Sequence, residues 1–89
     1  ARPQQSQIPT QQPVQTPAAG RVNSPNDAYL SLRAAPDHKT TELARIPHGT
    51  IIETFNCRGY TTIGGRRGRW CQTSFGGQTG WVFDGYVVY

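Results

Sequence analysis

The stretch RWCQTSFGGQTGWVF, residues 69–83, holds two runs of β-branched and aromatic residues on either side of a glycine pair. Such residues favour strands, and paired glycines between two such runs favour a tight hairpin turn. We therefore predict strands over residues 69–75 and 79–83, joined by a turn at residues 76–78. If Cys71 and Thr73 point inward, alternation along the strand sends Trp70 and Gln72 outward.

Short segments of the same kind lie on both sides of this hairpin, separated by proline, glycine and polar residues. This punctuation is typical of an all-β chain. The predicted elements are strands over residues 29–33, 43–46 and 50–56, a long mobile loop over residues 58–68, a single helical turn at residues 84–86 and a closing strand at residues 87–89.

The predicted fold class is all-β, a small barrel of five to six strands. So few residues cannot form a sandwich of usual size, whereas closing the sheet into a barrel removes its exposed edges. We expect Gly80 to mark a place where two backbones pass closely. The expected core is apolar and drawn from every predicted strand: Leu30, Leu32, Leu43, Ile46, Ile52, Cys71, Val82 and Val87.

Residues 1–27 differ in composition from the rest of the chain. They contain five of the seven prolines and six of the eight glutamines, but no aromatic residue. Such a segment buries too little apolar surface to offset the entropy lost on ordering. We therefore expect a disordered Pro/Gln/Thr-rich linker over residues 1–27 and one folded domain over residues 28–89.

The two cysteines are either free thiols or one disulfide. Cys57 and Cys71 lack the closely spaced partners that zinc requires, and His38 and His48 stand apart from them. Because their segments resemble the two arms of one hairpin, pairing is favoured. A disulfide indicates an oxidising compartment, so we expect a periplasmic or secreted protein whose export signal has been removed.

Several functional classes are excluded by what the sequence lacks. No apolar run approaches the ~20 residues that cross a bilayer. The carboxylates are scattered, the serines have no nearby histidine, and no phosphate-binding glycine loop is present. We expect a monomer that is not an enzyme and needs no cofactor or metal.

Four segments resemble bacterial Src-homology-3 (SH3) domains in order and spacing across residues 28–89. They are YLSLRAAP (residues 29–36), LARIPHGT (43–50), GRWCQT (68–73) and GQTGWV (77–82). The chain departs from the family pattern in the arginine-rich insert before residue 70, in Thr73 and in the cysteine pair. The resemblance implies an SH3-like barrel with a non-catalytic binding role at the cell envelope, on peptidoglycan or its peptides.

The family's groove lies between its first long loop and the connection of its third and fourth strands. Carried onto this sequence, the resemblance and the predicted exposure of the aromatic residues nominate a ligand groove. Its candidate residues are Tyr29, Asn56, Tyr60, Arg67, Trp70 and Tyr86.

Two other functions remain open at this point. The domain could bind a segment of another protein, or its own proline-rich tail. A weaker alternative is polyanion binding by Arg66, Arg67 and Arg69, since the chain has a net charge of +4 and these arginines cluster. Nucleic acid is an unlikely polyanion here, because Trp70 is the only aromatic neighbour of the cluster in the sequence that we expect to be exposed.

Overall fold

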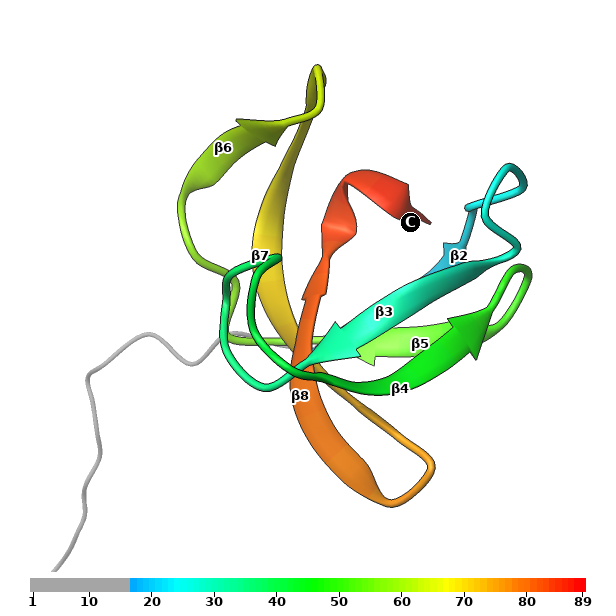
Figure 1. Cartoon of the computed structure of the whole chain (residues 1–89). Helices are drawn as coiled ribbons and strands as arrows, with labels where there is room; N and C mark the ends of the chain where they lie inside the picture. The colour runs from blue at the N-terminus through cyan, green and yellow to red at the C-terminus, as the bar shows by residue number, and fades with distance from the viewer. Residues whose placement is uncertain (1–16) are drawn as a thin grey trace, which may run out of the picture.

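The computed structural model describes residues 17–89, and these residues form a β-barrel of two sheets (Figure 1). One sheet has the strand order β5-β2-β9 and the other the order β4-β3-β8-β7-β6. The strands are β2 (Ala18–Val22), β3 (Tyr29–Arg33), β4 (Glu42–Pro47), β5 (Ile51–Thr54), β6 (Tyr60–Ile63), β7 (Arg66–Phe75), β8 (Gln78–Phe83) and β9 (Val87–Val88), with the 3-10 turn η1 (Asp84–Tyr86) before β9.

The predicted fold class is confirmed. The central hairpin, β7 with β8, pairs from Trp70↔Phe83 to Phe75↔Gln78 around the glycines at positions 76 and 77. Both glycines have positive φ, 61° and 78°, which a two-residue hairpin turn demands. The helical turn and the closing strand also lie where the sequence placed them.

Alternation along the strands builds the core. The fully enclosed cluster comprises Val22, Leu30, Leu32, Ile46, Ile52 and Val82, and Leu43 and Val87 pack against it from partly buried positions. Cys71 is also buried. The expected core residues are therefore buried or partly buried, but the expectation omitted three buried residues: Val22, which was assigned to the linker, and Trp70 and Phe83.

The predicted linker boundary at residue 27 is wrong. Strand β2 lies between β5 and β9 and pairs with both. It is held in place because Val22 is fully buried and because Gly20 lets β9 approach closely: a Cβ there would lie 2.5 Å from a methyl carbon of Val87. The prediction of disorder for residues 1–16 lies outside the described residues.

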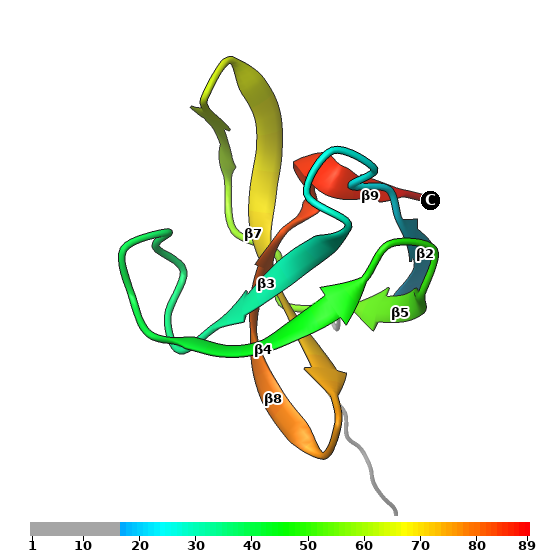
Figure 2. The ribbon, with the colours of Figure 1, turned by 45° about the vertical axis from the view of Figure 1, so that its right-hand side comes forward.

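The predicted mobile loop over residues 58–68 is instead a second hairpin. Its arms are β6 and the first part of β7, and they pair from Tyr60↔Arg69 to Ile63↔Arg66. Gly64 and Gly65 form its turn with φ of 58° and 80°. The glycines that suggested mobility are the ones a tight turn requires. Both views show this hairpin projecting from the barrel (Figure 2).

The predicted disulfide is present and joins Cys57 to Cys71. Cys57 lies just before β6 and Cys71 lies in β7, so the bond closes the base of the projecting hairpin. It therefore ties the hairpin to the sheet that carries the core.

Gly80 is the first point at which this fold can be tested. A Cβ at this position would lie 2.7 Å from the carbonyl oxygen of Arg33, where β8 crosses β3. We expect Gly80→Ala to lower the free energy of unfolding by about 1–3 kcal/mol, because backbone must move. Gly59→Ala is the control, since a Cβ there meets nothing within 4 Å. The stability of both variants would be measured by urea denaturation, and equal stability would refute the close approach of Gly80 to the Arg33 backbone.

Reduction of the disulfide tests the role of the cross-link. In the chain-entropy account, a bond across a loop of this length stabilises by about 3 kcal/mol. We expect a thiol reductant to lower the free energy of unfolding by about that amount in urea denaturation. The Cys57→Ala/Cys71→Ala variant should show no response to the reductant. An unchanged unfolding curve for the reduced native chain would contradict this role.

Candidate functional site

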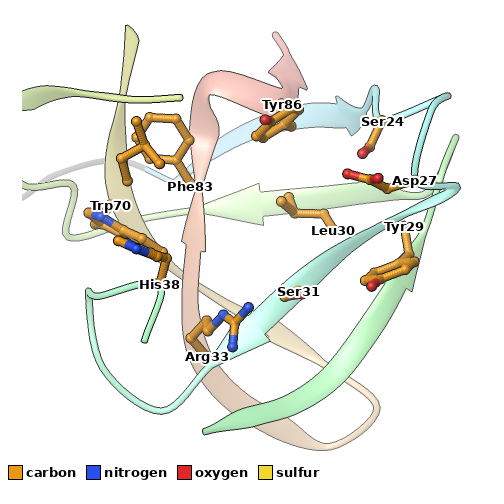
Figure 3. A pocket seen from close by; sticks show the side chains of 11 residues that line it. Ser24, Asp27, Tyr29, Leu30, Ser31, Arg33, His38, Trp70, Phe83 and Tyr86 are labelled. Carbon is orange, nitrogen blue, oxygen red and sulfur yellow. The ribbon is translucent and has the colours of Figure 1, made fainter. Parts of the chain in front are cut away.

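A pocket of about 270 Å³ is lined by residues of β3 and of β6, β7 and β8, strands of the same sheet in which β3 pairs with β8 at Arg33↔Trp81 (Figure 3). It combines aromatic walls with a few polar and charged side chains, the combination that binding sites use. Its lining residues are Ser24, Asp27, Tyr29, Leu30, Ser31, Arg33, His38, Ile63, Trp70, Phe83 and Tyr86.

One wall of the pocket is a continuous row of aromatic rings. Trp70 lies 5.6 Å from Phe83 between ring centroids, and Phe83 lies 6.2 Å from Tyr86 in an edge-on contact. Trp70 does point away from Cys71, as alternation predicted, but it is only 8% exposed. It is buried because Phe83 packs against it, a contact that the sequence reasoning missed. Most of the indole is therefore packed behind the surface of the pocket, and only a small part of it is exposed there.

Tyr29, on the opposite side of the pocket, is held by a chain of polar contacts. The hydroxyl of Ser31 donates to Glu42, and Arg45 Nε donates to the other carboxylate oxygen at 3.0 Å. The Arg45 guanidinium in turn lies 4.4 Å from the centroid of the Tyr29 ring. The hydrogen bond from Ser31, and then that from Arg45, lowers the pKa of Glu42. The ring is therefore braced from outside, and its remaining surface is available to the pocket.

Tyr86 is braced in the same manner. The Arg66 guanidinium lies 4.5 Å from its ring centroid and donates from Nη1 to the carbonyl oxygen of Gly85 at 3.0 Å. This arginine sits on the projecting hairpin, whose Ile63 lines the pocket. The hairpin thus contributes both a wall and a brace.

The charged groups of the pocket lie at its two ends (Figure 3). Asp27 belongs to the segment before β3, and within residues 17–89 no hydrogen bond or ion pair reaches its carboxylate. Arg33 ends β3, and its Nη1 donates to the carbonyl oxygen of Thr40 at 2.9 Å. That bond anchors the loop that carries His38, and the Thr40 hydroxyl adds a 2.7 Å bond to the carbonyl oxygen of Asp37.

The structure unites half of the predicted groove and separates the rest. Tyr29, Trp70 and Tyr86 line one pocket. Asn56 lies outside it and donates to Gln72 Oε1 at 2.7 Å. Tyr60 is three residues from Ile63, so the two side chains point to opposite faces of β6 and only Ile63 reaches the pocket.

Eight of the eleven lining residues were not predicted as groove residues: Ser24, Asp27, Leu30, Ser31, Arg33, His38, Ile63 and Phe83. Ser31 and Arg33 follow from alternation, because Leu30 and Leu32 point inward and their neighbours must point out. Asp27 and Ser24 gave no signal, since both were assigned to the linker. Whether any of these residues binds a ligand stays a prediction.

The arginine cluster proves to be largely engaged within the fold. Arg69 binds Asp84 through Nη2 at 2.8 Å and Nε at 3.0 Å, and its backbone N–H donates to the other carboxylate oxygen. Burial alone would lower the pKa of Arg69, but the hydrogen bond and charge of Asp84 outweigh it and raise that pKa. Arg67 stacks on Tyr60, with 4.5 Å between guanidinium and ring centroid. The cluster is therefore not a uniform charged surface.

Asp84 is the buried centre of this polar group. Tyr89 donates its hydroxyl to the carboxylate at 3.0 Å and lies 2.8 Å from the Thr54 hydroxyl. Cys57, Cys71 and Asp84 bring donor atoms within 4.8 Å of one another. However, both sulfurs are used in the disulfide and the carboxylate is bound by Arg69, so in this oxidised state the group does not offer a metal site.

The brace on Tyr29 can be tested through Glu42. We expect Ser31→Ala to raise the pKa of the Glu42 carboxyl toward the ordinary value of about 4.3. NMR titration of the side-chain carboxyl carbons would measure this pKa. Because folding lowers the pKa of Glu42, the brace is fully formed when the pH is above the ordinary pKa of the carboxyl. It is lost as the pH falls through the lowered pKa of the folded state. Ser74→Ala, whose hydroxyl bonds Thr79, is the control. An unmoved Glu42 titration in Ser31→Ala would show that Ser31 does not set it.

Comparison with known families identifies one match, to the bacterial SH3 domain, over residues 28–88. No curated protein and no solved structure matches the chain. In the part of the chain that the structure describes, no helix has the length and apolar character of a membrane span. The disulfide is consistent with a location outside the cytoplasm. Since the match covers more than half of the chain, this protein belongs to the bacterial SH3 domain family, whose members are typically non-catalytic binding modules.

Proposed function

We propose that this domain is a non-catalytic binding module of the cell envelope that holds a peptide or glycan segment of peptidoglycan in the pocket between β3 and the strands β6, β7 and β8 of the same sheet. The observation that carries the proposal is the pocket itself. Four aromatic side chains, Tyr29, Trp70, Phe83 and Tyr86, converge on a single hollow with charged groups at its ends.

The size and stiffness of the pocket fit a short segment of a larger ligand. At about 270 Å³ it lies just below the range of sites that enclose a drug-sized molecule. Because Tyr29 and Tyr86 are braced by arginines, little side-chain entropy is lost when a sugar ring or peptide packs on them. A module of this kind would position a partner at the wall without reacting with it.

The proposed location is the periplasm or the outside of the cell. The disulfide at the base of the hairpin supports this location, because such bonds persist in oxidising compartments. We expect the domain to act there as a monomer.

Two other functions have some support in the structure: binding of a partner protein and binding of a polyanion. A segment of a partner protein could occupy the same pocket, since its walls would accept any extended peptide. Polyanion binding has weaker support, because Arg69 is committed to Asp84 and Arg66 to Gly85 and Tyr86. Only Arg67 of the three lacks a hydrogen-bonded partner within residues 17–89.

Titration of the labelled chain with purified muropeptides tests the proposal. We expect amide chemical-shift changes around the pocket, and we expect Tyr29→Ala to weaken binding about tenfold through the lost ring contact. Tyr60→Ala is a matched control, since Tyr60 also lies beneath an arginine but outside the pocket. Equal losses in both variants, or shifts confined to the β6–β7 hairpin, would refute the pocket as the binding site. Absence of binding by muropeptides together with binding of a partner segment would favour the protein-interaction alternative.

A further inference from the structure

We propose, resting on the function proposed above, that the pocket selects a short zwitterionic peptide, whose ammonium group lies at Asp27 and whose carboxylate lies at Arg33 and His38. The juxtaposition that carries this inference is a pocket with one carboxylate at one end, two basic side chains at the other and aromatic rings between them (Figure 3).

The acidic end is open to a ligand. Asp27 is exposed, and no cation within residues 17–89 pairs with it. Arg66 lies across an adjoining hollow that Asp27 also lines, but its guanidinium is held on Gly85 and over the Tyr86 ring. Asp27 is therefore the one acidic group that faces the pocket without a partner, which suits a primary ammonium group.

The basic end keeps donors for an anion. Arg33 uses Nη1 on Thr40, and a guanidinium has further N–H groups in the same fork. His38 reaches Asp37 only at 3.8 Å, so this acid balances it weakly. The nearest carboxylate on the neighbouring strand, Glu42, is already bound by Ser31 and Arg45. A carboxylate from a ligand would thus meet uncommitted donors.

The length of β3 sets the length of the ligand. Tyr29 and Arg33 are separated by four residues of extended strand, about 13 Å at about 3.3 Å per residue. Asp27 adds at most about 7 Å, and less in fact because Ala28 has a φ of 68° and turns the chain. At the same rise, an extended peptide of about four to six residues spans this range, with its apolar middle over Leu30 and between the rings, so a tetrapeptide is the shortest that fits.

End-blocked peptides provide the test. The probes are tetra-alanine with free ends, its N-acetyl form, its C-terminal amide and the doubly blocked form, titrated against the labelled chain. Each blocked end should weaken binding roughly threefold to fivefold, the upper range for exposed ion pairs. Asp27→Asn should remove the penalty of N-acetylation only. Arg33→Gln should remove the penalty of C-terminal amidation only. Because Arg33 also anchors the loop through Thr40, His38→Ala is a second variant, and it should reduce the same penalty.

Matched controls and outcomes separate this inference from the function on which it rests. Glu53→Gln and Arg58→Gln remove an exposed acid and an exposed base that do not line the pocket, and both should retain the preference for free ends. Equal affinity of all four peptides would overturn the zwitterion inference. Muropeptide shifts at the pocket with no tetra-alanine binding would also overturn it, yet leave the binding module standing. Failure of muropeptides and tetra-alanine alike to perturb the pocket would remove both.

Discussion

The ladder between β7 and β8 is the constraint on which the rest of the structure depends. Its register places Cys71 opposite Val82 on the core side and Trp70 opposite Phe83 on the other. Because side chains alternate strictly along paired strands, a slip of one residue would send the tryptophan into the barrel and the valine into the pocket. The ladder thus decides which side chains lie in the core and which line the pocket.

Two further ties convert this ladder into a site. Asp84, just after β8, binds Arg69 on β7 and fixes the 3-10 turn that presents Tyr86. The disulfide fixes the base of the β6–β7 hairpin, and that hairpin supplies Ile63 and the arginine that braces Tyr86. Neither tie touches the pocket, but each sets the position of a residue that lines it. The pocket is accordingly a product of long-range connections more than of any local motif.

The difference between local motifs and long-range connections explains what could be predicted from the sequence. Strands with clear alternation, such as Tyr29–Arg33, and the turn at Gly76 and Gly77 were found because their signals are local, whereas the same glycine signal at Gly64 and Gly65 was misinterpreted as a mobile loop. Strand β2 was missed because Ala18–Val22 contains one large apolar residue, and its order comes from two strands far along the chain. For the same reason, only Tyr29, Trp70 and Tyr86 of the predicted groove residues lie together in one pocket. Alternation gives the face of a residue, but it cannot say that Phe83 covers Trp70 or that Asp27 reaches the pocket.

Most of the arginines named above have structural roles that the net charge of the chain does not reveal. A basic excess in a small domain suggests attraction to anionic polymers. Here Arg45 and Arg66 stack on the two tyrosines of the pocket, Arg67 stacks on Tyr60 and Arg69 neutralises a buried carboxylate. A guanidinium suits this task because it is planar, weakly hydrated and able to hold a hydrogen bond while covering a ring. Lysine would supply the same charge without stacking flat on the ring, so the positive charge of this chain is better understood as support for the aromatic pocket than as a separate anion-binding surface.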